Sequence, residues 1–289
     1  MPGRMLRDEP HWLAAGYGRA DLVRRRAVLR ETLAVFDTDD KRERYRALAM
    51  RNLERWRAAA HASNEAALEI RVLPGDWGDV TGQLTRERGV CFAALNMANA
   101  HVPGGAYVEG TAAQEENMFR RTDCHYRIGA DHYDAAIDRY RPDMTRLLSA
   151  ADGAVYLDTA QPRVCVRGAE DRARADLGYP WLAEHEIFPF FELRAAAQDM
   201  RGRTRFDAAE ARHRIACQLD TLRAAGLRHA VLSAFGCGAF ENPPEVVAAI
   251  YRDELAARRA DFSLIAFAIF APGYGPDNHV VFASVLAGS

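Results

Sequence analysis

The chain has 289 residues, of which 49% are hydrophobic and 27% charged, so it is long and apolar enough to bury a substantial core. Its formal net charge of −2 excludes a global electrostatic attraction to nucleic acid or anionic membrane, and we expect neither as a partner. No apolar run approaches the length of a membrane span, and the first residues lack the apolar segment of a signal peptide.

The cysteines are an odd set without a CxxC pair: Cys91, Cys124, Cys165, Cys217 and Cys237. Such spacing predicts reduced thiols in a cytoplasmic protein and argues against a structural zinc site. His125 and His132 lie near aspartates, but their spacing matches no standard ligand pattern, and surface histidines are the simpler interpretation. We therefore expect no metal.

The first part of the chain, residues 1–66, is predicted to be a helical extension. Residues 1–14 show no regular pattern, whereas the apolar positions of residues 19–36 recur at helical spacing. Thr38 has the chemistry of an N-cap for a second helix that runs to about Ala60, with two aspartates in its first turn. Acids and arginines are interleaved in that helix, which favours a solvated face over a nucleic-acid patch.

From residue 67 to residue 289, strand and helix patterns alternate. We expect strands at 68–73, 90–95, around Tyr156 and Val164, at the start of 229–240, at 263–271 and at 279–287, and helices at 206–225 and 245–259. Alternation of this kind, with near-continuous apolar strands, predicts an α/β core with a mixed, largely parallel sheet covered by helices on both faces.

The stretch 101–121, HVPGGAYVEGTAAQEENMFRR, joins a diglycine turn to two adjacent carboxylates, Glu115 and Glu116. Glycines let backbone N–H groups approach a ligand closely, and the N-terminus of a following helix adds donors suited to a phosphate. Thr111 and Gln114 have the spacing of a capping box, which predicts a helix that begins near Thr111. The alternative is a loop and a capped helix whose glutamates face water.

Glycine-rich or polar loops follow several of the expected strands, at 74–79, 96–106 and 236–244. Because ligands of open α/β sheets bind beyond the carboxyl ends of the strands, these loops could together form a concave site. Each also has a structural explanation. Asp76 could be an ordinary turn residue, Asn96 and Asn99 could close a turn, and Gly236 and Gly238 could let the chain reverse.

The stretch 101–121 resembles the signature of poly(ADP-ribose) glycohydrolases, in which a glycine triplet is followed six to eight residues later by Gln-Glu-Glu. Here Gly104-Gly105-Ala106 is followed, after seven residues, by Gln114-Glu115-Glu116. The segments NMANAHVPGG and VLSAFGCGAFENPPEVVA are similar to those of the shorter, bacterial-type members. The resemblance covers most of the chain and implies a macrodomain core, residues 67–289, behind the helical extension. The third glycine is replaced by Ala106, whose methyl group we expect to crowd the diphosphate or the terminal ribose.

The resemblance also implies a reaction: hydrolysis at the anomeric carbon of an ADP-ribose unit, without a cofactor, on ADP-ribose polymer or an ADP-ribosylated protein. By analogy Glu116 is the acid/base, and Glu115 holds the reactive ribose. Two neighbouring carboxylates in a water-poor cleft cannot both ionise cheaply, so one of them should keep its proton to higher pH.

The remaining implied contacts surround the ligand. Gly104 and Gly105 would offer backbone donors to the diphosphate side, and Ala106 and Gln114 of the same motif would also contact the ligand. An opposing cradle would be formed by Gly236, Cys237, Gly238, Ala239 and Phe240. Asn99 would bind the terminal ribose, and Asp76 would accept a hydrogen bond from the adenine amino group.

Other functions stay open at this point. A close variant would remove a single ADP-ribose from a protein side chain such as arginine. A binding module that holds ADP-ribose without turnover is disfavoured, because it has no need for an acid/base pair. Cys237 could act as a nucleophile with a histidine as base, although a glycine-flanked cysteine in a phosphate loop is explained by its backbone.

Overall fold

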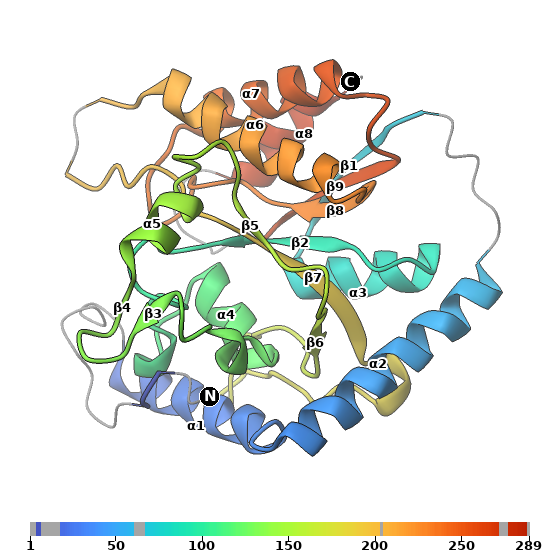
Figure 1. Cartoon of the computed structure of the whole chain (residues 1–289), viewed down its shortest axis with the longest axis vertical. Helices are drawn as coiled ribbons and strands as arrows, with labels where there is room; N and C mark the ends of the chain where they lie inside the picture. The colour runs from blue at the N-terminus through green and yellow to red at the C-terminus, as the bar shows by residue number, and fades with distance from the viewer. Residues whose placement is uncertain (1–3, 7–17, 61–66, 203–204, 272–276, 288–289) are drawn as a thin grey trace.

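The computed structural model describes residues 4–6, 18–60, 67–202, 205–271 and 277–287. At its centre lies a seven-stranded sheet in the order β1-β9-β8-β2-β7-β5, with β6 also pairing with β7 (Figure 1). The strands are β1 Glu69–Pro74, β2 Ala93–Met97, β5 Tyr156–Leu157, β6 Arg163–Cys165, β7 Phe188–Ala195, β8 His229–Leu232 and β9 Leu264–Ile269. The pairs from β1 to β7 are parallel, and β5 and β6 run antiparallel to β7. The predicted mixed, largely parallel sheet is confirmed.

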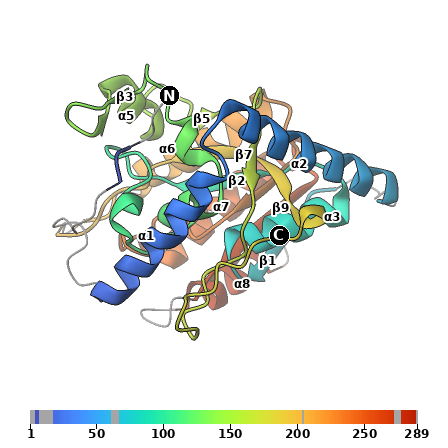
Figure 2. The same cartoon turned by 90° about the horizontal axis from the view of Figure 1, so that it is seen from below.

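Helices cover both faces of this sheet (Figure 1). On one face lie α6 Ala208–Ala224, α7 Pro244–Ala257 and α8 Asn278–Leu286; on the other lie α3 Trp77–Arg88 and α4 Gln114–Arg121. The helices α1 Arg19–Ala34 and α2 Asp39–Ala59 form an outer layer on the second face, which Figure 2 shows from below. At one edge α5 Pro142–Leu148 adjoins the hairpin of β3 Tyr133–Asp134 and β4 Arg139–Tyr140. Within the described residues, no helix combines the length and apolarity needed to cross a membrane.

Strand β9 shows why the sheet needs two layers of helices. All six of its residues are buried. Ile265, Phe267 and Ile269 pack into the cluster formed with α6, α7 and α8, whereas the alternate residues Leu264 and Ala266 pack into the cluster formed with α3. Because successive side chains of a strand point to opposite faces, a strand buried on both faces reads as a continuous apolar run.

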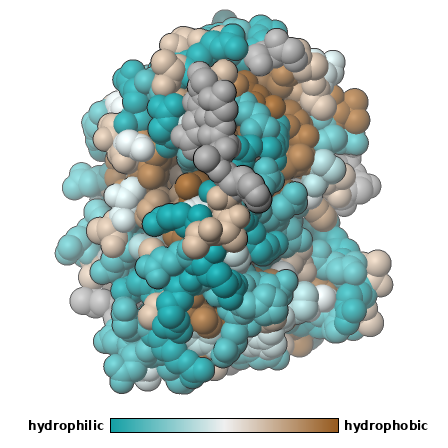
Figure 3. Space-filling view, turned by 90° about the vertical axis from the view of Figure 1, so that its right-hand side faces the viewer, coloured by the Kyte–Doolittle hydropathy of each residue, from teal (hydrophilic) through white to brown (hydrophobic). Residues whose placement is uncertain are grey.

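The two N-terminal helices begin as predicted. The side chain of Thr38 caps α2 by accepting a hydrogen bond from the N–H of Lys41. Leu29 of α1 and Trp56 of α2 belong to the apolar cluster that also contains Phe119 of α4. On the face seen in Figure 3, hydrophilic residues prevail over the lower half, where α2 lies. Most of residues 1–14, and the proposed domain boundary at residue 66, lie outside the described residues, so the division into extension and core stays a prediction.

One expected helix starts later than predicted, and one expected strand is wrong. Helix α4 is present but begins at Gln114, with Ala113 as its N-cap. No capping box forms, because the Gln114 side chain is bound to β2 and the Thr111 hydroxyl donates to Glu116. The segment expected to be a final strand is helix α8, whose N-terminus is capped by Asp277. Phe282 and Leu286, four residues apart, are its buried positions, and this helical spacing suits packing on α7 and β1.

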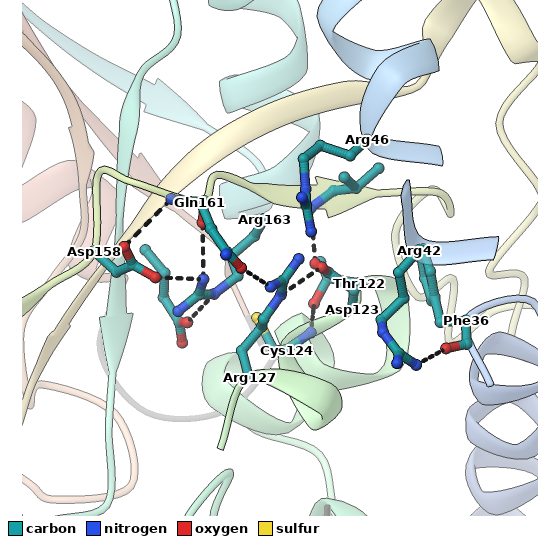
Figure 4. Close-up of polar contacts among 12 residues, drawn as sticks. Phe36, Arg42, Arg46, Thr122, Asp123, Cys124, Arg127, Asp158, Gln161 and Arg163 are labelled. Carbon is teal, nitrogen blue, oxygen red and sulfur yellow. Dashed lines mark hydrogen bonds and ion pairs between the residues drawn. The ribbon is translucent and has the colours of Figure 1, made fainter. Parts of the chain in front are cut away.

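Strand β7, helix α3 and helix α5 were not anticipated. β7 is hard to recognise because Glu192 and Arg194 interrupt its apolar residues, yet both are buried. Arg194 and Arg163 of β6 donate to the Glu192 carboxylate at 2.6 and 2.9 Å. Arg163 also donates to the Asp158 carboxylate at 3.2 Å and to the carbonyl oxygen of Gln161 at 2.9 Å (Figure 4). The charges offset one another, which lets a charged strand lie inside the sheet.

We predict that Glu192→Gln lowers the free energy of unfolding by about 3–5 kcal/mol at pH 7, because two buried guanidinium groups lose their counter-charge. Burial opposes ionisation of Glu192, but Arg194 and Arg163 lower its pKa to about 2. The contribution of its charge is therefore present above the ordinary carboxyl pKa and is lost as the pH falls toward 2. Urea unfolding at several pH values should show the difference between the two proteins shrinking in acid. Asp253→Asn, in an exposed pair with Arg252, should change little, and a Glu192→Gln protein as stable as the original would contradict this prediction.

Candidate active site

A cavity of about 330 Å³ lies at the carboxyl edge of the sheet. The loops after β1, β2, β8 and β9 reach it, because parallel strands end at the same edge. The three loops singled out in the sequence therefore meet at one site. The predicted residues that line the cavity are Asp76, Asn99, Gly105, Ala106, Gln114, Glu115, Glu116, Gly236, Gly238, Ala239 and Phe240.

Glu115 lies in the first turn of α4 and is almost fully buried. Its Oε2 accepts a hydrogen bond from the N–H of Asn99 at 2.8 Å, and its Oε1 accepts one from the N–H of Gly104 at 3.1 Å. Burial and the neighbouring Glu116 raise the pKa of Glu115 well above its ordinary value. This is the behaviour that adjacent carboxylates predict: one of the pair holds its proton to higher pH.

Glu116 is held by a different set of donors. Its Oε1 accepts from the N–H of Ala106 at 3.1 Å and from the hydroxyl of Thr111 at 3.3 Å. Its Oε2 makes no hydrogen bond with any part of the chain that the structure describes, and the side chain lines the cavity. One carboxylate oxygen of Glu116 is thus fixed by the loop, and the other is left for a group in the cavity.

The diglycine turn is shaped around these two carboxylates. Gly105 has a φ of +59°, and a Cβ added there would lie 2.5 Å from Oε1 of Glu116 and 3.3 Å from Oε2 of Glu115. Gly104 has a φ of +71°, and its Cβ would meet the ring of Tyr107 at 2.5 Å. Ala106, in contrast, has a φ of −102°, so its backbone does not require glycine.

The turn does not offer its N–H groups to a ligand. The N–H of Gly104 donates to Glu115, and that of Gly105 donates to the carbonyl oxygen of Val102 at 3.0 Å. Gly104 also does not line the cavity in the described structure. The expected role of these glycines as diphosphate donors is therefore corrected: their backbone donors are used inside the protein.

Asn99 and Gln114 both anchor the loop. The Asn99 Oδ1 accepts from the N–H groups of His101 and Val102 at 2.8 and 3.0 Å and so closes a turn. The Gln114 side chain accepts from the N–H of Met97 at 2.9 Å and donates to the carbonyl of Leu95 at 2.6 Å. Since both polar groups of the Gln114 amide are bound to β2, this residue ties the start of α4 to the sheet.

Asp76 is the N-cap of α3, where Oδ1 accepts from the N–H of Gly78 at 2.8 Å. The same oxygen is paired with Arg121, a buried residue that also donates to Asp79 at 2.8 Å and lies over the Trp77 ring. Arg121 was missed in the sequence because its acidic partners lie 45 and 42 positions earlier. It holds Asp76 at the cavity wall.

The opposing wall is the loop after β8. Gly236 has a φ of +76°, and Asn242 fastens the loop by donating to the carbonyls of Gly236 and Phe240 at 3.1 Å each. Among the described residues, the N–H groups of Gly238, Ala239 and Phe240 have no acceptor. Consecutive backbone donors of this kind are typical of anion-binding loops, and the expected cradle stays a prediction.

Cys237 does not belong to this cradle. It is buried away from the cavity, and its N–H donates to the carbonyl of Ala234 at 3.0 Å. Burial raises the pKa of its thiol, which disfavours the thiolate that a nucleophile needs. Both the predicted ligand contact of Cys237 and the alternative of a cysteine nucleophile are therefore corrected.

Two arginines at the cavity were also missed. Arg172 lies over the ring of Phe270 at 5.5 Å, and Arg201 lies over the ring of Phe240 at 5.1 Å. Both line the cavity, and both are partly exposed and paired with an acid, Glu170 and Asp199 respectively. The sequence offered no signal for them, because arginine is common throughout the chain.

We predict that Gly105→Ala lowers the free energy of unfolding by about 1–3 kcal/mol, because it forces a Cβ into a left-handed backbone against Glu116. Ala106→Gly, one residue on, is the matched control and should cost no more than about 1 kcal/mol. Thermal and urea unfolding of both variants measure the difference. Equal stability of Gly105→Ala and the original protein would show that the turn tolerates a side chain.

The chain is similar to one known enzyme family and to several solved structures. Residues 29–151 match the family model described as the microbial-type PARG catalytic domain. The structure of poly(ADP-ribose) glycohydrolase from Thermomonospora curvata, bound to the inhibitor ADP-HPD, is similar with a TM-score of 0.61 at 23% identity, over 90% of this chain and 98% of that one. The enzyme from Deinococcus radiodurans in complex with ADP-ribose is similar with a TM-score of 0.54 at 22% identity, over 85% of this chain and 92% of that one. Curated proteins gave no match.

The matched segment 29–151 contains the diglycine turn and both glutamates, and the solved structures share the fold over most of the chain. The family match therefore confirms the resemblance to the bacterial-type poly(ADP-ribose) glycohydrolases that the sequence predicted, and the solved structures confirm the predicted fold.

Proposed function

We propose that this protein is a glycosidase that hydrolyses the O-glycosidic ribose–ribose bonds of poly(ADP-ribose) and releases ADP-ribose. One observation carries the proposal. Two adjacent carboxylates, both held by one glycine turn, face a cavity whose other wall carries backbone N–H groups that have no acceptor among the described residues. A glycosidic bond needs a carboxyl group at the bond that breaks, and a diphosphate needs donors nearby.

In the proposed reaction Glu116 supplies the proton. Its carboxylic acid protonates the glycosidic oxygen while the bond from that oxygen to the anomeric carbon breaks. Positive charge then develops at this anomeric carbon, in the ribose that stays bound in the site. A water molecule then attacks that carbon, and its proton returns to the Glu116 carboxylate. The assignment is supported by the fixed Oε1 and by the Oε2, which has no hydrogen-bond partner in the described part of the chain, because the loop orients the group and leaves one oxygen for transfer.

Glu115 would hold the reactive ribose through its hydroxyl groups, and its raised pKa allows it to donate as well as accept. The diphosphate would bind the N–H groups of Gly238, Ala239 and Phe240, with Gly236 shaping the loop. The amide nitrogen of Asn99, which donates to none of the described residues, would bind the terminal ribose, and Asp76 would accept from the adenine amino group. The Oδ2 of Asp76 would accept this hydrogen bond, because its Oδ1 already accepts hydrogen bonds from Gly78 and Arg121.

A second candidate is removal of a single ADP-ribose from a protein side chain. The observation that favours it is Ala106, a residue of the cavity lining whose N–H donates to the carboxylate of Glu116. Its methyl group, where the related signature has a hydrogen atom, would narrow the space for the leaving group. An arginine-linked ADP-ribose presents a slimmer leaving group than a second ADP-ribose unit.

We predict that Glu116→Gln lowers the release of free ADP-ribose from a poly(ADP-ribosyl)ated protein by about 10²–10⁴-fold, the usual loss on removing a positioned acid/base. Affinity for ADP-ribose, measured by calorimetry, should change little, because the amide keeps the shape of the carboxyl group. Glu54→Gln, an exposed glutamate of α2, is the matched control and should leave both quantities unchanged.

The same assay on an arginine-mono(ADP-ribosyl)ated protein separates the alternatives. Release from this substrate alone, abolished in Glu116→Gln, would assign the protein as a side-chain ADP-ribosyl hydrolase. Tight ADP-ribose binding with no release from either substrate would identify a binding module. Full activity of Glu116→Gln would remove Glu116 from the mechanism.

A further inference from the structure

Arg4 lies buried beneath the diglycine turn, far in sequence from the residues it contacts. Its side chain is 1% exposed, and its Nε and Nη2 donate to the two carboxylate oxygens of Asp138 at 2.6 and 2.7 Å. Its Nη1 donates to the carbonyl oxygens of Pro103, at 2.9 Å, and of Gly105. The ring of Tyr107 lies 5.5 Å from the guanidinium carbon. A two-pronged pair with a carboxylate fixes the plane of the guanidinium, and this fixes the direction of Nη1.

The two carbonyl groups belong to the peptide groups that hold the carboxylates. The peptide group between Pro103 and Gly104 accepts from Arg4 at its oxygen and donates its N–H to Glu115 Oε1. The peptide group between Gly105 and Ala106 accepts from Arg4 at its oxygen and donates its N–H to Glu116 Oε1. Because a trans peptide group is planar and its C=O and N–H point in opposite directions, Arg4 contacts the back of both groups and the carboxylates contact the front.

We infer that Arg4 is a positioning residue that acts on Glu115 and Glu116 through these two peptide groups; the inference rests on the proposed function of the carboxylate pair. A cation at a carbonyl oxygen polarises the peptide group and makes its N–H a stronger donor. It also prevents either peptide group from rotating away from its glutamate. The turn needs such support because both of its glycines have positive φ and no side chain to hold them.

Removal of the guanidinium tests this role in catalysis. Arg4→Ala should lower kcat on poly(ADP-ribose) by about 10- to 100-fold, with a smaller change in KM, as expected when a catalytic group is misplaced by a distant change. Arg4→Lys, which keeps a cation but not the fork, should retain more activity than Arg4→Ala. The pH dependence of kcat should shift to higher pH in Arg4→Ala, because the Gly104 N–H that donates to Glu115 becomes a weaker donor to its charged form. The other charged groups that act on Glu115 are Glu116, Arg194 and Glu192, and this variant leaves them in place.

The controls separate positioning from stability. Arg24→Ala removes an arginine of α1 whose partner is the exposed Asp21, and it should change neither kcat nor the pH profile. Asp138→Asn removes the charge that orients Arg4, while asparagine still accepts the positive φ of 53° at this position. It should lower kcat in the original protein but not further in Arg4→Ala, since the two changes act on one interaction.

A second readout does not depend on activity. Hydrogen exchange of the amides of Gly104 and Ala106 should be faster in Arg4→Ala than in the original protein or in Arg24→Ala. If the original protein releases no ADP-ribose from polymer or mono-modified protein, the proposed function fails, while the exchange rates still test the contact of Arg4 with the turn. Unchanged exchange at both amides would overturn the proposal. So would a loss of kcat that is accompanied by a lower unfolding temperature and an unmoved pH profile.

Discussion

The burial of two adjacent glutamates is the constraint on which the rest of the site depends. Glu115 and Glu116 lie at the start of α4 with little exposure to water, where two carboxylates repel each other and lose their hydration. The protein offsets this with N–H donors from Asn99, Gly104 and Ala106. To aim these donors at the carboxylates, the turn adopts a positive φ at two successive residues, and a side chain at Gly105 would collide with the glutamates. The glycines therefore serve the carboxylates, whereas three backbone N–H groups of the opposing loop after β8 have no acceptor among the described residues.

The sheet converts this local arrangement into a cavity. The parallel strands β1, β9, β8 and β2 end at one edge of the sheet. Segments that are far apart in the chain therefore line one cavity of about 330 Å³. Buried ion pairs keep those segments in place: Arg121 holds Asp76 at one wall, and Glu192 joins β6 to β7 beneath the site. Each of these charges is compensated by partners from another element. Loss of one partner would leave an uncompensated buried charge and destabilise the elements that form the site.

Much of the fold and part of the site could be predicted from the sequence. The apolar run 264–269 identified β9, and the chemistry of Thr38 identified the start of α2, because both signals are local. Strand β7 escaped notice because Glu192 and Arg194 broke its pattern, and their compensation by Arg163 is a tertiary contact. The final helix was mistaken for a strand because its β-branched residues suit either structure. Its burial at Phe282 and Leu286 is decided by α7 and β1.

The sequence by itself determined that Glu115 and Glu116 are adjacent, that glycines precede them, and that glycine-rich or polar segments at 74–79, 96–106 and 236–244 come at the ends of apolar runs. These are properties of residue type and spacing, which tertiary structure does not alter. Only the tertiary structure decided how each residue is used. Gln114 anchors α4 to β2, and Cys237 is buried in the core. The N–H of Gly104 donates to Glu115 of α4, and that of Gly105 donates to Val102. Arg4 reached the turn from 99 and 101 positions away. The direction of a donor depends on the backbone around it and on partners distant in sequence, and no local pattern records either.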